Sequence, residues 1–261
     1  MTRLVQPAET AECLAALGQQ YLLREIGPAL LAEITPHLEA EKLYSSRPIY
    51  TAGRPGVWLE SLYLVISGGP VILRSTPLDR VIAVVYPGGS FGMHDLPLGC
   101  GRVCRAFPSL VEAYKTTAVL KLPLRVVETL YDQQVSFRQR YDTLFEIQQK
   151  FQYHLLNCSA YPPQAVAALL RALVYQEREL GHQPSPDGIY RFNLPLDIIA
   201  RACQLNHRTV DLVLKGMVKA GLIQPLGQED TPQDQVAVVD PERLKEVYGA
   251  TRDKVDWWPL R

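Results

Sequence analysis

Cationic and amide side chains recur at helical spacing between Leu196 and Ile223, and their chemistry suits contact with nucleic acid. An arginine such as Arg208 can donate two hydrogen bonds to a guanine edge, and Lys215 or Lys219 can neutralise phosphate. Residues 191–226 hold five Lys/Arg and two Asp/Glu, whereas the whole chain has equal numbers, 27 Lys/Arg and 27 Asp/Glu. The pattern predicts a local DNA contact made by Asn206, His207, Arg208, Thr209, Asp211, Lys215 and Lys219.

Two short amphipathic helices would position these residues. Ile198, Ile199 and Ala202 give residues 196–203 an apolar face, and the chain breaks at residues 204–206. Asn206 stands at an N-cap position, and Gly221 at a stop position. The helix between them carries a second apolar face at Val210, Val213, Leu214, Met217 and Val218. This is the helix-turn-helix pattern, whose second helix enters the major groove; the alternative is two helices that only pack on a core.

A strand is expected at residues 235–239, after a turn rich in glycine and proline. A strand–turn–strand unit behind a helix-turn-helix would form a wing.

In the part of the chain before this unit, the pattern of apolar residues changes from helical spacing to short runs. Residues 8–43 have helical spacing, with breaks at Pro28 and Pro36. Short apolar runs separated by glycine and proline then predict a sandwich or barrel, with strands at Pro48–Tyr50, Leu59–Ile66, Val71–Arg74, Val81–Tyr86, Leu110–Thr116 and Val119–Leu122.

Helices are expected over residues 123–133, 136–159 and 164–180. The second carries a seven-residue repeat at Phe137, Tyr141, Leu144, Gln148, Phe151, Leu155 and Cys158. We take this seam as a dimer coiled coil; the alternative is packing against the chain's own domain. The Pro162-Pro163 pair ends the helix. The expected fold is α+β, with a first domain of helices and strands at residues 1–124, a dimerisation helix at 125–160 and a DNA-binding domain at 161–261.

The bulk composition excludes several classes of protein. With 261 residues and 47% hydrophobic content, the chain has enough apolar residues for a folded core. No run approaches 18 apolar residues and the N-terminus lacks the pattern of a signal peptide, so we expect a cytoplasmic protein. The five cysteines are scattered, and the single C-x3-C pair, Cys100 and Cys104, lacks the partners of a zinc site. No P-loop, HExxH or nucleophile elbow occurs, so we expect no enzymatic activity.

Three stretches together resemble the cAMP receptor protein / fumarate-nitrate regulator (Crp/Fnr) family of bacterial transcription factors. They are LESLYLVISGGPVIL, VIAVVYPGGSFGMHDL and DIIARACQLNHRTVDLVLKGMVKAGLI, and the likeness spans roughly residues 40–245. The resemblance implies a cyclic-nucleotide-binding-type β-roll, a long dimerisation helix and a C-terminal winged helix-turn-helix. It also implies a homodimer that binds double-stranded DNA and contacts RNA polymerase.

The chain departs from the family where the family binds cAMP. The family's ribose-binding glutamate and its phosphate-binding Arg-Ser pair fall here on Met93, Phe107 and Pro108. An iron–sulfur site would need more N-terminal cysteines than Cys13, and His94 is a lone candidate for haem. We therefore expect another nucleotide, best c-di-GMP, which a cyanobacterial branch of the family binds. Its candidate ligands are Arg47, Arg54, Trp58, Arg102 and Arg105, and the alternative is a solvated loop with salt-bridged arginines.

The second helix also departs from the family. The positions that read bases in the family are occupied here by His207, Arg208 and Leu212. The family's usual half-site is therefore not expected. An alternative function is a nucleotide sensor whose winged helix contacts another protein instead of DNA.

Overall fold

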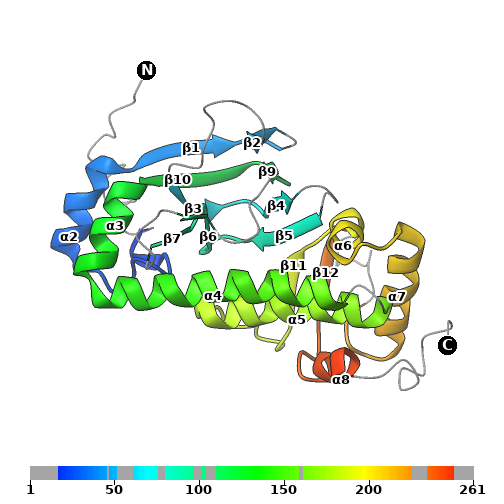
Figure 1. The fold of residues 1–261 in the computed structure, drawn as a ribbon. Coiled ribbons are helices and arrows are strands. Elements are labelled where there is room, and N and C mark those ends of the chain that lie inside the picture. Colours follow the sequence, from blue (N-terminus) through cyan, green and yellow to red (C-terminus); the bar gives the residue numbers. More distant parts are fainter. Residues whose placement is uncertain are drawn as a thin grey trace. The chain divides into compact units, whose positions relative to one another are not determined.

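The structure is a computed structural model that describes residues 17–45, 47–51, 61–75, 80–96, 102–103, 110–158, 161–224 and 234–249. The chain divides into two compact units (Figure 1). The first lies within Met1–Leu73 and Val84–Gln149, and the second within Arg74–Ala83 and Lys150–Arg261. No helix in these described ranges is long and apolar enough to cross a membrane.

Two four-stranded sheets form the β-roll. The order in one sheet is β1 (Glu39–Leu43), β10 (Thr117–Pro123), β3 (Ser61–Ser67) and β6 (Ser90–Phe91). The order in the other is β2 (Pro48–Thr51), β9 (Leu110–Ala113), β4 (Val71–Ser75) and β5 (Arg80–Val85). A short ribbon joins β7 (His94–Asp95) to β8 (Arg102–Val103). The strands expected from the sequence are present with small shifts at their ends.

Apolar side chains hold the centre of the first sheet together. β3 and β10 are antiparallel, and Leu62 and Leu64 lie opposite Leu122 and Leu120. All four leucines are buried. Tyr63, on the other face of β3, stacks on Phe91 of β6 with ring centroids 4.6 Å apart. This cross-strand packing places β6 and the glycine after it, in the segment that resembles a nucleotide cassette.

The helical prediction for residues 8–43 is wrong at its end. The helix α2 (Pro28–Ile34) and a 3₁₀ turn (Thr35–His37) are followed by strand β1. β1 pairs with β10, and Lys121 of β10 lies between Glu39 and Glu41 with nitrogen–oxygen distances of 2.9 and 3.4 Å. A strand partner that is distant along the chain thus overrides the helical spacing. Residues 8–16 lie outside the described ranges.

Helices α3 (Leu124–Gln133) and α4 (Val135–Cys158) follow the roll, as expected. The seam on α4, however, is used inside the chain. Phe137, Tyr141 and Leu144 are 0%, 1% and 4% exposed, and Gln148 donates a hydrogen bond of 2.9 Å to the Ser90 carbonyl of β6. Leu155 and Cys158 have no described side chains. Over the first three turns of the seam the structure thus shows the alternative, packing against the chain's own domain. The predicted contact between two protomers along α4 stays a prediction.

Tyr131 of α3 completes this packing. Its ring lies edge-on to Tyr141 at 5.6 Å, and its hydroxyl donates a 2.8 Å hydrogen bond to Asp142. Burial, together with that hydrogen bond to a carboxylate, raises the pKa of Tyr131 to about 12. The interaction ties α3 to α4.

The second unit is mainly helical. It contains α5 (Pro162–Leu180), β11 (Tyr190–Asn193), α6 (Leu196–Cys203), α7 (His207–Lys219), β12 (Gln235–Val238) and α8 (Arg243–Gly249). The α5 helix packs against α6, α7 and α8. The strand β11 and the helix α8 were not predicted, because each is short and depends on its partner element.

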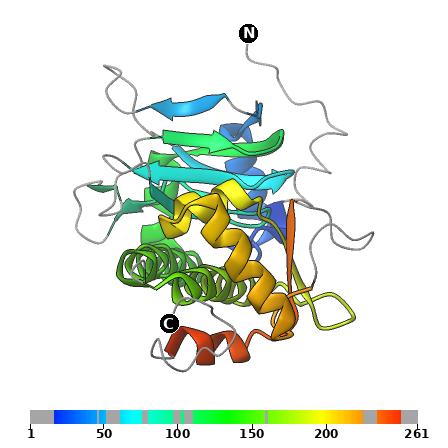
Figure 2. The same ribbon diagram turned by 90° about the vertical axis from the view of Figure 1, so that its right-hand side faces the viewer.

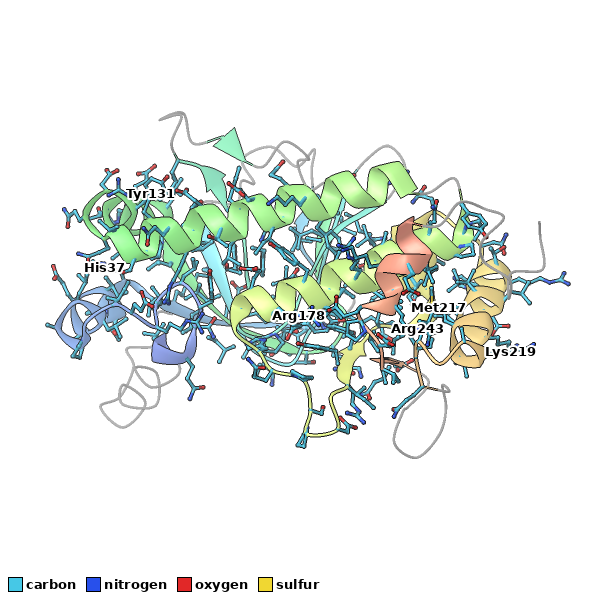
Figure 3. All side chains as sticks on the ribbon, turned by 90° about the horizontal axis from the view of Figure 1, so that it is seen from below. His37, Tyr131, Arg178, Met217, Lys219 and Arg243 are labelled. Atoms are coloured by element: carbon cyan, nitrogen blue, oxygen red, sulfur yellow. The ribbon has the colours of Figure 1, made fainter. Side chains whose placement is uncertain are left out.

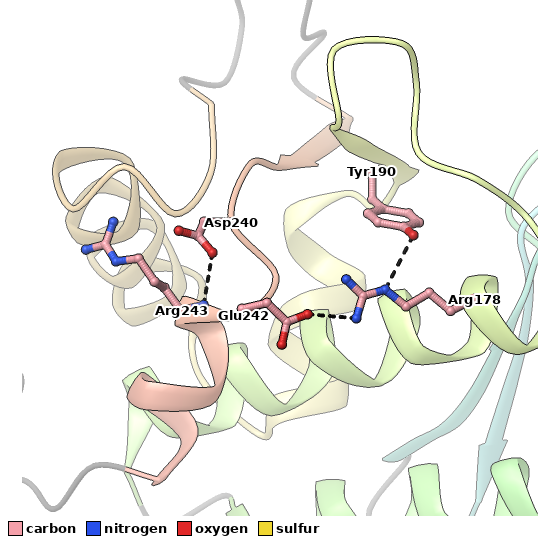
Figure 4. A network of polar contacts seen from close by, with 5 residues as sticks. All are labelled: Arg178, Tyr190, Asp240, Glu242 and Arg243. Atoms are coloured by element: carbon pink, nitrogen blue, oxygen red, sulfur yellow. Dashed lines mark hydrogen bonds and ion pairs between the residues drawn. The ribbon is translucent and has the colours of Figure 1, made fainter.

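A polar network fastens three of these elements (Figure 4). Arg178 of α5 donates to Glu242 at 2.8 Å and to the Tyr190 hydroxyl of β11 at 3.4 Å. Asp240 accepts from the backbone N–H of Arg243 at 3.0 Å and so caps α8. These contacts hold together α5, β11 and the start of α8, and α6 and α7 pack against α5.

Candidate nucleic-acid interface

A tight break joins α6 to α7 (Figure 2). Gln204 has φ of 54°, in the left-handed region, and the N–H of Leu205 donates to the Ala200 carbonyl at 2.9 Å. The Asn206 side chain then accepts from the N–H of Thr209 at 2.8 Å. The two predicted helices and the predicted N-cap are confirmed. Asn206 therefore caps the start of α7, and its predicted contact with DNA stays a prediction.

The inner face of α7 is fully used in packing. Val210, Val213, Leu214 and Met217 are all 2% exposed or less. Gly221 has φ of 69° just beyond the helix, which fits its predicted role as the stop. The helix is thus fixed in its rotation about its own axis, and this decides which side chains face outward.

Four side chains project from the opposite side, and we call them the outer face of α7: Arg208, Leu212, Lys215 and Lys219. Their spacings of four, three and four residues place them along one line. All four are exposed, and Lys219 extends outward from the end of the helix (Figure 3). His207 is also exposed, whereas Thr209 and Asp211 are half-buried.

Ion pairs change the charge count of the region. Arg191 pairs with Asp187 at 2.6 Å, Arg201 with Asp197 at 3.9 Å, and Lys215 with Asp211 at 2.7 Å. The pKa of Asp187 lies below its usual value because Arg191 donates hydrogen bonds to it. Within the described residues, Arg208 and Lys219 form no ion pair.

Arg208 and Lys219 therefore offer charge to an approaching phosphate or base without the need to break an existing ion pair. The number of Lys/Arg in residues 191–226 overestimated the positive charge available to a ligand, because three of these five side chains already have acidic partners.

A small sheet adjoins the two helices. The predicted strand at residues 235–239 is present as β12, and it pairs antiparallel with β11. Residues 222–224 also run antiparallel to it, through the bridge of Ile223 with Val238 and the 2.9 Å hydrogen bond from Gln224 to the Ala237 carbonyl. This is the base of a wing; residues 225–233, where its tip would be, lie outside the described ranges.

The candidate nucleotide ligands are only partly described. Arg47 is exposed, with its guanidinium 5.6 Å from the centre of the Tyr44 ring. Arg102 lies on β8, but its side chain is not described. Arg54, Trp58 and Arg105 lie outside the described residues, as do Phe107 and Pro108. This set of predicted ligand residues therefore stays a prediction.

The start of the cassette-like segment is well described. Gly92 has φ of 81°, and a Cβ there would lie 2.6 Å from the Ser61 carbonyl oxygen. Met93 follows and is 1% exposed. Its thioether sulfur is at most a weak hydrogen-bond acceptor.

Leu212 is the residue of the outer face that was missing from the predicted DNA-binding set. By the sequence resemblance it falls at a base-reading position of the Crp/Fnr family, as a departure from the family's residue. The structure shows that its side chain faces outward, between the cations.

Solved structures share this fold. FixK2 from Bradyrhizobium japonicum matches with a TM-score of 0.60 and 16% identity, over 82% of this chain and 98% of that one. The c-di-GMP-responsive global regulator CLP of Xanthomonas campestris matches at 0.52 and 15%, over 82% and 100%. A Crp/Fnr-family transcriptional regulator of Thermus thermophilus matches at 0.51 and 16%, over 81% and 99%. No protein-family model and no curated protein matches the chain.

At these identities the likeness shows the fold. The chain has the α+β architecture of Crp/Fnr transcriptional regulators, as its sequence resemblance led us to expect.

Proposed function

We propose that this protein is a dimeric, sequence-specific DNA-binding transcription regulator of the Crp/Fnr type, without enzymatic activity. One observation carries the proposal. A capped helix, fixed by its buried inner face, presents an exposed Arg208 with no ion pair among the described residues at its first turn. Side chains at the start of such a helix reach base edges in the major groove, and an arginine there pairs with guanine.

Two protomers related by a two-fold axis would present two copies of α7. The DNA sites then form a pseudo-palindrome with half-sites about 34–36 Å apart. The first three turns of the heptad seam on α4 are buried within the chain, so the dimer needs another surface. The exposed side of α4 carries Val135, Gln139 and Glu146, and we assign the partner protomer to it.

Selection from a random duplex library tests the proposal. We expect the wild type to enrich a palindromic motif. Arg208→Ala should cost about 1–3 kcal/mol of binding free energy and relax the preference at one position of each half-site. Lys219→Ala should weaken the binding of all duplexes alike. It should also reduce the slope of log K against log salt by about 0.9 for each phosphate that the variant no longer neutralises.

Lys245→Ala is the matched control, because it removes the same charge from an exposed position on α8. Its binding should equal that of the wild type. If the wild type enriches no motif at moderate salt, the proposal fails. The winged helix would then be better interpreted as a surface for another protein.

We propose further that the β-roll senses a nucleotide other than cAMP, and that c-di-GMP is its ligand. The buried Met93 supports this, because it replaces a carboxylate that would bind the ribose of cAMP. The candidate arginines carry the charge that two phosphates need. CLP, whose fold this chain shares, is c-di-GMP-responsive.

Calorimetric titration tests the ligand. We expect c-di-GMP to bind at micromolar concentration and cAMP not to bind. A double variant with alanine at Arg102 and Arg105 should lose about 1.5–3 kcal/mol of c-di-GMP binding free energy for each charged hydrogen bond removed. Micromolar cAMP binding would contradict the role given to Met93, and binding of neither nucleotide would remove the nucleotide part of the proposal.

A further inference from the structure

Leu212 is an apolar side chain on a surface that is otherwise charged. It is 39% exposed, while the apolar face of α7 is complete without it. Arg208 lies one turn before it on the same line, and Lys215 one turn after it. Its position between two cations fits an acidic surface that also carries an apolar group. Duplex DNA presents both together, because thymine displays a methyl group in the major groove between the phosphate strands.

We propose that Leu212 is a specificity-determining residue that contacts the C5 methyl group of a thymine. This inference rests on the proposed function, since it requires α7 to lie in the major groove. It adds an apolar base contact to the one made by Arg208. Leu212 would therefore select thymine at a position where a hydrogen-bonding side chain would select another base.

The helix geometry places this thymine relative to the base contacted by Arg208. Leu212 lies four residues further along α7, which is about 6 Å along the helix axis. Successive base pairs are about 3.4 Å apart. The thymine should therefore lie within about two base pairs of the guanine contacted by Arg208, on either strand.

Replacing thymine by deoxyuridine removes only the methyl group and so provides the test. Duplexes are first selected with the wild-type protein, and each thymine of the selected half-site is then replaced in turn. At one position we expect the affinity to fall about fourfold, because burial of one methyl group contributes about 0.8 kcal/mol of binding free energy. Replacement in both half-sites should lower the affinity about fifteenfold.

The protein variants make the test specific to Leu212. Leu212→Ala should bind the thymine duplex more weakly and lose nothing more when uracil replaces thymine. Leu212→Met keeps an apolar side chain of similar reach and should stay sensitive to the methyl group. Because Leu212 is exposed, neither variant should change the unfolding midpoint, so a folding defect cannot imitate the result.

The outcomes separate this inference from the proposed function. A selected motif whose thymines all tolerate uracil would overturn the role of Leu212 and leave DNA binding intact. Equal sensitivity to uracil in the wild type and Leu212→Ala would also overturn it. If no motif is enriched at all, the proposed function fails, and the contact of Leu212 with thymine fails with it.

Discussion

Replacing Leu144 by aspartate should unfold the β-roll unit rather than separate two protomers. Leu144 is 4% exposed within a single chain, between the ring packing of Tyr141 and the hydrogen bond of Gln148 to β6. The variant loses the burial of a leucine, about 1.5–3 kcal/mol, and places a carboxylate in an apolar environment. An unpaired buried charge costs about 3–5 kcal/mol. The sum approaches the whole stability of an ordinary domain.

Urea unfolding followed by circular dichroism measures this effect, and sedimentation gives the oligomeric state. Gln133→Asp is the matched control, because it puts the same charge on an exposed position at the end of the preceding helix, α3, outside the surface that we assign to the partner protomer. It should change the unfolding free energy by less than about 1 kcal/mol. If Leu144→Asp is insoluble, Leu144→Ala should still lose about 2–5 kcal/mol. A Leu144→Asp chain that is monomeric but fully stable would restore the seam as an interface between protomers.

Gly68→Ala adds a single methyl group and should strongly destabilise the roll. Gly68 has φ of 86°, and a Cβ there would overlap the Thr116 carbonyl oxygen. The backbone would have to move, which threatens the neighbouring 2.9 Å hydrogen bond from Gly69 to the Thr117 hydroxyl. We expect a loss of about 3 kcal/mol or more, from left-handed backbone strain, the overlap and the weakened hydrogen bond.

Gly188→Ala isolates the part of this loss that comes from the overlap. Gly188 has φ of 79°, but a Cβ there meets nothing within 4 Å. Alanine at this position should cost only the conformational strain, about 1–2 kcal/mol. Each variant is measured on the unfolding transition of its own unit. Equal losses in the two variants would show that backbone conformation alone, and not the contact with Thr116, makes Gly68 necessary.

Local side-chain patterns were enough to predict the elements whose cause is local. The helix at residues 196–203 was predicted with its true ends, and Asn206 was recognised as a cap. Both follow from side chains within one or two turns of each other. One is the apolar spacing of a helix, and the other is a side-chain amide oxygen that accepts a hydrogen bond from the backbone N–H three residues later. The strands of the roll were found for the same reason, since alternation and turn residues act over a few positions.

The surfaces that these elements cover depend on the folded chain. Residues 39–43 continue a helical stretch in the sequence, yet they form β1 because β10 offers a ladder of backbone partners. The seam of α4 has the spacing of a coiled coil, and that spacing is the same whether the partner is a second chain or the roll. Tyr131 and Ser90 occupy it, from elements other than α4 itself.

In the candidate site, too, the local features could be predicted from the sequence and the tertiary ones could not. Its helix, its cap and its cationic residues could be predicted from the sequence, but their availability could not. Lys215 is paired with Asp211, whereas Arg208 has no ion pair among the described residues. Leu212 faces outward because Val210, Val213 and Met217 occupy the inner face and set the rotation of α7. Rotation and pairing depend on every neighbour at once, and a pattern of residues along one helix does not contain them.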